Sequence, residues 1–176
     1  MNNSTYWYEF TQNNSGGSFV VDDKVCHRIY IEAEDFREAV AIAERLGCYW
    51  NGVKKGIDCP CCGDRWSKWD KDPIDLEEYN TEGMNAEVYD SIYPDTKAEW
   101  NKKYGHYEII ERPKFVNDYG RTYKGRIKIK NIEEYAQFMA DSYGWTIPDA
   151  RIYYRDGTVK EVFKEWYIWQ TNLKKS

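Results

Sequence analysis

The most regular hydrophobic pattern in the chain is a short alternating segment at residues 27–33. Ile29 and Ile31 fall on one side of the alternation, with Arg28 and Tyr30 on the other. A period of two residues is typical of a β-strand that buries one face. We therefore predict a strand here, with its isoleucine face turned toward a core.

A helical pattern follows this strand directly, over the segment FREAVAIAERLG. Its apolar side chains recur at three- and four-residue spacing, at Phe36, Val40, Ala43 and Leu46. Asp35 stands where a helix-capping side chain belongs, and Gly47 stands where a helix ends in a left-handed residue. The sequence predicts one strand–helix unit with both ends of the helix marked.

The remaining regular elements follow from weaker versions of the same patterns. The predicted strands are residues 6–12, 19–21 as a returning strand, 106–112, 123–130 and 165–170. A second helix is predicted over residues 132–143, and a hairpin over 152–163 around an Asp-Gly turn. Together these elements predict an α+β fold, with an antiparallel or mixed sheet and two principal helices.

Residues 28–47 and 126–144 share the order Arg-Ile-x-Ile, helix, glycine, at an offset of 98 positions (126 − 28). A true repeat would place two helices on one face of a sheet. Coincidence between two ordinary strand–helix units is the favoured explanation of the similarity.

The pattern is interrupted between the two halves of the chain. Residues 48–71 hold three glycines, one proline and a cluster of three cysteines, which predicts an irregular cysteine-rich excursion. Residues 72–105 are acidic and aromatic, with weak helical periodicity at 86–92 and 96–104. We interpret the chain as a single domain, residues 1–176, in which 72–105 is an insertion.

Composition narrows the classes of partner. The net charge is −5 and the pI is about 5.2, which argues against a general electrostatic grip on nucleic acid. Aromatic residues reach 17%, enough to supply both a core and a binding surface. The first ten residues have neither a basic nor an apolar run, so we expect no secretory signal, and the longest aliphatic run, residues 39–43, is too short to span a membrane. An odd number of cysteines, five, without an export signal predicts reduced thiols and a cytoplasmic location.

The segment DCPCCGDRW at residues 58–66 contains the candidate metal site. Cys59 and Cys62 have the C-P-x-C-G spacing of a zinc knuckle, in which two thiolates point to one centre. A structural zinc needs four ligands, so the sequence predicts that Cys61 and Cys48 complete the site, with Cys26 or His27 as alternatives. Buried, unliganded cysteines and a redox-active C-x-x-C pair remain open as other interpretations.

The same segment ends in Asp-Arg-Trp, which suggests a ligand pocket. An arginine fork can hold a phosphate or carboxylate, and a tryptophan can stack on a base. A second loop, rich in asparagine and glycine, can form an anion-holding nest of backbone N–H groups. The candidate ligand-binding or partner-binding residues are Asn14, Gly16, Gly17, Asp64, Arg65 and Trp66. The alternative is a surface ion pair beside a tryptophan that packs over the cysteines.

Catalytic templates are missing from the sequence. It holds no phosphate-binding loop, dinucleotide fingerprint or nucleophile elbow, and its two histidines stand beside no nucleophile pattern. We therefore expect a protein that is not an enzyme.

Two segments, FTQNNSGG at residues 10–17 and DCPCCGDRW, carry a resemblance over residues 6–66. They resemble the N-terminal region of small phage-encoded proteins of Gram-positive hosts. The resemblance implies an accessory protein that acts in the host cytoplasm as a stoichiometric inhibitor of a host antiviral defence protein. The alternatives are a sponge for a nucleotide signal and a zinc-ribbon-like binder of nucleic acid or of the transcription machinery.

Overall fold

The computed structural model describes residues 4–68, 72–81, 100–101, 104–113, 125–143 and 148–164. The chain divides into two compact units. The first unit comprises residues 1–75 and 136–176, and the second unit comprises residues 76–135. The predicted insertion at 72–105 therefore falls mostly in the first part of the second unit.

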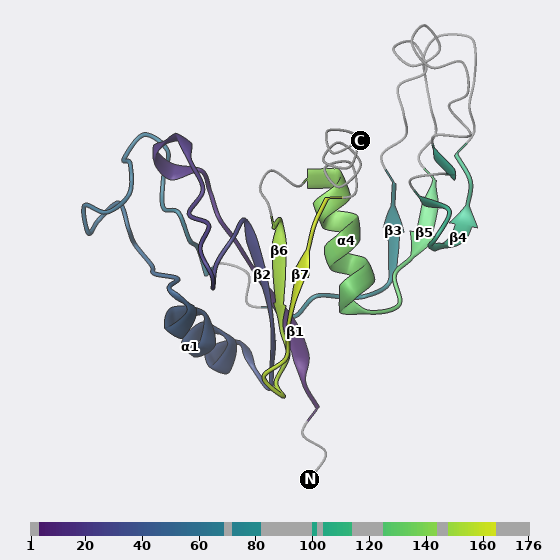
Figure 1. The fold of residues 1–176 in the computed structure, drawn as a ribbon, viewed down its shortest axis with the longest axis horizontal. Helices are drawn as coiled ribbons and strands as arrows, with labels where there is room; N and C mark the ends of the chain where they lie inside the picture. Colours follow the sequence, from purple (N-terminus) through teal and green to yellow (C-terminus); the bar gives the residue numbers. More distant parts are fainter. Residues whose placement is uncertain are drawn as a thin grey trace, which may run out of the picture. The chain divides into compact units, whose positions relative to one another are not determined.

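A four-stranded sheet forms the framework of the first unit (Figure 1). Its strands are β1 (Tyr6–Thr11), β2 (Arg28–Ala33), β6 (Ala150–Tyr153) and β7 (Val159–Val162), in the order β1-β2-β6-β7. The β1–β2 and β6–β7 pairs are antiparallel, whereas β2 and β6 are parallel. The sheet is thus mixed, and the predicted α+β class is confirmed.

Helix α1 (Phe36–Leu46) begins and ends at the residues that the sequence marks. The Asp35 carboxylate accepts the backbone N–H of Glu38 at 2.8 Å, which satisfies one of the free donors of the first turn. Gly47 closes the helix at φ 113°, a left-handed conformation that favours glycine. The most buried positions of α1 are the small residues Ala39 and Ala43, which let the helix approach the sheet closely.

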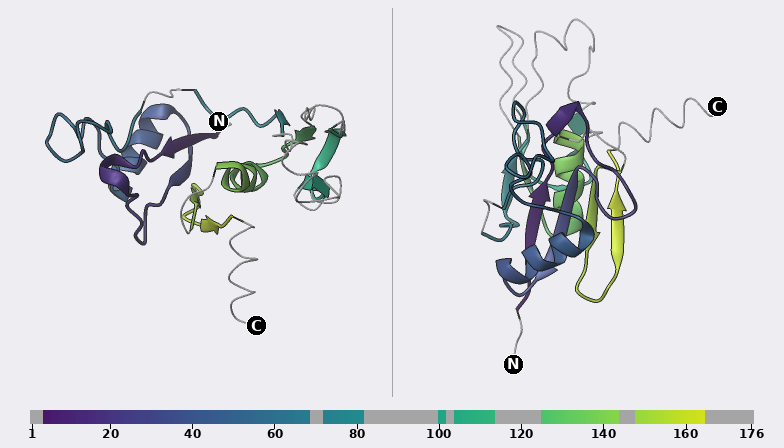
Figure 2. Two further views of the ribbon diagram at one scale, coloured as in Figure 1. Left: turned by 90° about the horizontal axis from the view of Figure 1, so that it is seen from above. Right: turned by 90° about the vertical axis from the view of Figure 1, so that its left-hand side faces the viewer.

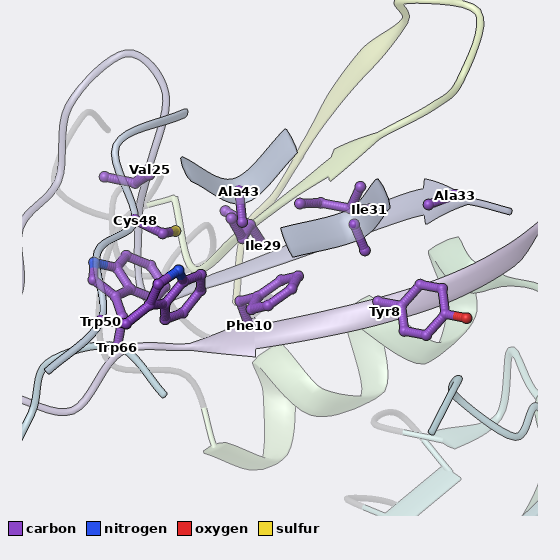
Figure 3. Packing of buried hydrophobic residues seen from close by; sticks show 11 residues of the cluster. Tyr8, Phe10, Val25, Ile29, Ile31, Ala33, Ala43, Cys48, Trp50 and Trp66 are labelled. Atoms are coloured by element: carbon purple, nitrogen blue, oxygen red, sulfur yellow. The ribbon is translucent and has the colours of Figure 1, made fainter. Parts of the chain in front are cut away.

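The core of the first unit lies between α1 and one face of the sheet. Tyr8 and Phe10 of β1 join Ile29 and Ile31 of β2 on this face, as the alternation predicts (Figure 3). The loops after the helix close one end of the cluster with Cys48, Trp50 and Trp66. Three aromatic rings are in contact there: Phe10 lies 5.8 Å from Trp50 and 6.2 Å from Phe36 between ring centroids.

The opposite face of the sheet is covered by the second half of α4 (Ile132–Tyr143), the part that belongs to the first unit (Figure 2). Arg28 projects to this side, where its Nη2 donates to the Tyr143 carbonyl at 3.4 Å. Gln137 of the same helix donates to the Phe163 carbonyl just after β7 at 2.9 Å. The two helices therefore lie on opposite faces of the sheet.

The second unit has a three-stranded antiparallel sheet. Its strands are β3 (Glu78–Asn80), β4 (Glu108–Glu111) and β5 (Arg126–Lys128), in the order β3-β5-β4. Because β2 and β5 belong to different sheets, the two similar strand–helix segments do not form one layer. The helical segments predicted at 86–92 and 96–104 fall mostly outside the described residues, and the strand predicted at 165–170 falls wholly outside them.

The predicted returning strand at residues 19–21 is wrong. The backbone N–H and carbonyl of Val20 bond the side-chain amide of Gln12, at 2.8 and 2.7 Å, instead of a neighbouring strand. The partner of β1 is β2, so residues 12–27 form a long connection rather than a tight hairpin.

Candidate binding surface at the cysteine loop

Two loops that are remote in sequence meet at one end of the first unit. We call residues 13–18 the Asn–Gly loop and residues 51–66 the cysteine loop. The backbone N–H of Asn13 donates to the Arg65 carbonyl at 2.8 Å, and its side chain donates to the Cys62 carbonyl at 2.5 Å. The Ser15 hydroxyl accepts the N–H of Cys59 at 2.9 Å. The two loops are thus one structure, as a shared binding surface requires.

Arg65 is the main link between the loops. Its guanidinium donates to the carbonyls of Ser15 and Ser18, both at 2.6 Å, and to Gln12 Oε1 at 3.2 Å. Only 9% of the residue is exposed. Such a buried cation is stable only when its donors are satisfied, and here three protein oxygens satisfy them.

Asp58 completes this arrangement from the cysteine loop. Its carboxylate accepts the backbone N–H of Arg65 at 2.7 Å and the Tyr49 hydroxyl at 2.6 Å. One carboxylate oxygen lies 3.8 Å from Arg65 Nε. Burial raises the pKa of Tyr49, and its hydrogen bond to Asp58 raises that pKa further. We refer to Gln12, Asp58 and Arg65 as the polar hub.

The absence of a side chain at Gly52 leaves space for Asp58 of the polar hub. A Cβ at this position would overlap the carboxylate of Asp58 and come within 2.7 Å of the Tyr49 ring. Neither side chain can withdraw without losing its hydrogen bond. Glycine is required at this position because the two side chains approach its Cα closely. Backbone conformation is not the reason, since the φ of Gly52 lies outside the left-handed region.

We expect Gly52→Ala to lower the free energy of unfolding by about 1–3 kcal/mol, the usual cost of overpacking a filled site. Gly56→Asn is the matched control in the same loop. Gly56 has φ 71°, which asparagine tolerates, and open space around its Cβ position. Urea denaturation measures both variants; equal stability of the two would contradict the close packing at Gly52.

The cysteine turn, residues 59–63, projects from this framework. The Cys59 carbonyl accepts the N–H groups of Cys62 at 3.1 Å and Gly63 at 3.0 Å. The backbone N–H of Cys61, followed by bonds from Cys62, lowers the pKa of the Cys59 thiol. The hydrogen bond to Cys59 raises the pKa of Cys61. Cys59 is half-buried, whereas Cys61 and Cys62 are exposed.

The other two cysteines are buried elsewhere in the first unit. Cys48 lies in the hydrophobic cluster beside Trp50 and Trp66 (Figure 3), and burial raises its pKa to about 12. Cys26 is fully buried, and burial raises its pKa to about 12 as well. Within the described ranges, no three Cys, His, Asp or Glu side chains form a group that could hold a metal ion. The structure does not bring Cys48 into such a group with Cys59, Cys61 and Cys62.

The remaining candidate residues have different surroundings. Asn14, Gly16 and Gly17 are exposed, and the Gly17 N–H donates to the Asn14 carbonyl at 2.8 Å instead of standing free for an anion. Asp64 accepts the Val53 N–H at 2.8 Å, which fastens the cysteine loop to itself. Trp66 is 2% exposed and packs in the core, so its faces are not open to a nucleotide base.

One buried polar pair escaped the sequence analysis. His27 Nδ1 lies 3.1 Å from Asp149 Oδ1, and both side chains are buried. The pair joins the residues just before β2 and β6, beside the bond from the Arg28 N–H to the Asp149 carbonyl at 3.0 Å. The two residues stand 122 positions apart, so no local signal could have connected them. Asp58 and Gln12 were also missed; the seven-residue spacing of Asp58 and Arg65 around the cysteine turn is the one available hint.

Comparison with known proteins identifies a family for most of the chain. The model of a family described as a domain of unknown function, DUF7296, matches residues 5–111, which include the polar hub and the cysteine turn. Neither a curated protein nor a solved structure matches the chain. None of the described helices is long and apolar enough to cross a membrane.

Proposed function

We propose that this chain, which belongs to the DUF7296 family, is a non-catalytic protein that binds stoichiometrically to another protein. The resemblance to phage-encoded proteins suggests the class of target, a host antiviral defence protein in the host cytoplasm. The binding surface in this proposal is formed by the Asn–Gly loop with residues 19–21 and by the cysteine loop.

The observation that carries the proposal is that the guanidinium of Arg65 donates its hydrogen bonds to oxygens of the protein itself. A nucleotide sponge requires a guanidinium whose donors face the ligand, yet Arg65 donates to Gln12, Ser15 and Ser18. A phosphate would have to displace these oxygens from the guanidinium and leave the Ser15 and Ser18 carbonyls unpaired, at a cost of about 1–3 kcal/mol for each. Binding of a protein needs no such rearrangement.

The exposed side chains of the loops suit a protein partner. Val20 and Val21 are 43% and 42% exposed, and Ile57 is 60% exposed. The backbone beside these side chains is held in place, because Val20 is bonded to Gln12 of the polar hub and the Ile57 N–H donates to the Gly52 carbonyl at 2.8 Å. Exposed apolar side chains are typical of protein-binding surfaces. A rigid framework beneath them lowers the entropic cost of association. The net charge of −5 adds no support for a nucleic-acid partner.

A binding experiment with matched variants tests the proposal. Tagged protein is incubated with lysate of a Gram-positive bacterium, retained proteins are identified by mass spectrometry, and the affinity for the purified target is measured. We expect Val21→Asp and Ile57→Asp each to weaken binding by about 10-fold or more, since a buried interface side chain contributes above 1 kcal/mol. Val159→Asp is the control, because Val159 is 49% exposed on β7, away from both loops.

Two results would contradict the proposal. One is a retained target whose affinity is the same for the wild type, the loop variants and the Val159→Asp control. The other is a rise in melting temperature with a cyclic or ADP-ribose-type nucleotide that Arg65→Lys abolishes, because that would restore Arg65 to the role of a ligand-binding residue.

A further inference from the structure

The cysteine turn has the local geometry of half a zinc site. Its closing bonds to the Cys59 carbonyl place Cys59 and Cys62 on one tight turn. The backbone N–H groups of Cys61 and Cys62 are directed at the Cys59 sulfur, and the Cys62 side chain is within hydrogen-bonding reach of the same sulfur. Ser15 and Asn13 fix the turn from outside through Cys59 N–H and the Cys62 carbonyl, so the pair is ordered before any ion arrives.

The other cysteines and the two histidines, all of them described, offer this half-site no complete partner. All five cysteines and both histidines of the sequence lie in the described residues. Cys26 and Cys48 are buried with their pKa raised to about 12, which disfavours the thiolate form. His27 is buried against Asp149. Only His106 remains; it belongs to the second unit, and one added histidine would still leave the pair one ligand short of four.

Because the cysteine turn is exposed, a second copy of the chain can supply the two missing ligands. Cys61 and Cys62 are exposed, and Lys54 and Lys55 of the same loop are exposed as well. Two copies related by a twofold axis would bring two identical C-x-x-C pairs together, which gives four thiolates in all. Such a centre carries a formal charge of −2.

We propose that the cysteine turn binds Zn²⁺ between two copies of this chain, with Cys59 and Cys62 of each copy as the four ligands. The ion replaces the thiol protons, and four protons are released to solvent if all four sulfurs begin as thiols. Cys61 is not a ligand; its backbone N–H supports the Cys59 sulfur. The inference is independent of the proposed function, because it concerns self-association through the turn and requires no host target.

Sedimentation velocity of the full chain tests this directly. The protein is reduced with a phosphine, stripped of metal with EDTA, desalted and then titrated with ZnCl₂. We expect a monomer of 21.0 kDa without zinc and twice that mass with zinc, at one zinc per two chains by elemental analysis. EDTA should reverse the association. Titration with Co²⁺ should give the visible absorption of a tetrahedral tetrathiolate centre, at the same ratio of one to two.

Variants separate the proposed ligands from the neighbouring thiol. Cys59→Ser and Cys62→Ser should weaken zinc-dependent association by more than about 100-fold, since loss of even a hydrogen-bonded neighbour of a ligand costs about 10- to 100-fold. Cys61→Ser, in the same turn, should still dimerise with zinc. Circular dichroism confirms that each variant is folded.

Four results would overturn the inference. A monomer with one zinc per chain would place the missing ligands within one copy. A dimer that persists in EDTA and reductant would not depend on the metal. Equal association of Cys59→Ser and the wild type would exclude the turn, and no zinc uptake by protein with five titratable thiols under denaturing conditions would exclude the site.

Discussion

Arg65→Met is expected to lower the free energy of unfolding by about 3–5 kcal/mol, the range measured when one partner of a buried charge network is removed. The side chain is 9% exposed and provides donors for Gln12, Ser15 and Ser18. Methionine fills much of the volume but donates no hydrogen bond. The variant therefore leaves the two backbone carbonyls unpaired, takes one of two donors from Gln12 Oε1, and leaves the buried Asp58 carboxylate 3.8 Å from the lost cation.

Urea denaturation with the matched variant Arg37→Met measures this effect. Arg37 is exposed on α1, so its replacement should change stability by less than about 0.5 kcal/mol. Arg65→Lys should fall between the two, because an ammonium keeps the charge but cannot reach three acceptors in a fixed fork. If Arg65→Met is as stable as Arg37→Met, the guanidinium does not hold the loops together.

Raising the pH from 8 to 10 is expected to lower the free energy of unfolding by about 3 kcal/mol through the two buried thiols. Burial raises the pKa of Cys26 and Cys48 from the ordinary 9.0 to about 12. In this pH range the unfolded chain loses these protons while the folded chain keeps them. The stabilisation that the two buried thiols contribute is therefore fully present below pH 9 and is lost as the pH rises toward 12. The loss between pH 8 and 10 is about 1.4 kcal/mol per thiol.

The contribution of each thiol can be separated by substitution. Cys48→Ala removes one titrating group, so the loss between pH 8 and 10 should shrink from about 3 to about 1.4 kcal/mol. Val159→Ala, which replaces an exposed side chain without a titrating group, should leave the loss unchanged. Denaturation midpoints at several pH values in reductant provide the measurement. A free energy of unfolding that is flat over this range would show that Cys26 and Cys48 ionise in the folded protein.

The elements with local signals were predictable from sequence. Helix α1 has its cap at Asp35 and its end at Gly47, and the isoleucine face of β2 follows from a simple alternation. Helix α4 spans the predicted residues 132–143. Each of these signals depends on neighbours within about four positions, where periodicity and capping act.

The pairing of distant segments was not predictable in the same way. The parallel contact between β2 and β6 joins residues about 120 positions apart, such as Arg28 and Ala150, and no local pattern specifies it. The failed strand at residues 19–21 has a related cause. Its valines suit a strand, but the Gln12 side chain takes the backbone groups of Val20 that a strand would have paired.

For the candidate site, too, the sequence predicts the local features but not the contacts between distant residues. The sequence identifies Arg65 and the cysteines as unusual residues, and it suggests that the Asn–Gly loop and the cysteine loop belong together. It does not reveal that the arginine donors are directed inward to carbonyls 47 and 50 positions away. The identity of a side chain sets which bonds it can make, whereas the fold decides whether protein or ligand supplies the partner.

Hydrogen–deuterium exchange of Arg65→Met and the wild type tests the central claim most directly, namely that Arg65 joins the two loops into one rigid surface. The informative amides are those of Asn13, Cys59 and Arg65, each bonded across or beside the loops. We predict that these amides lose protection together in Arg65→Met, at exchange times when amides of β2 and α1 remain protected. Unchanged protection of both loops in the variant would contradict the account and would leave Arg65 free to bind a ligand.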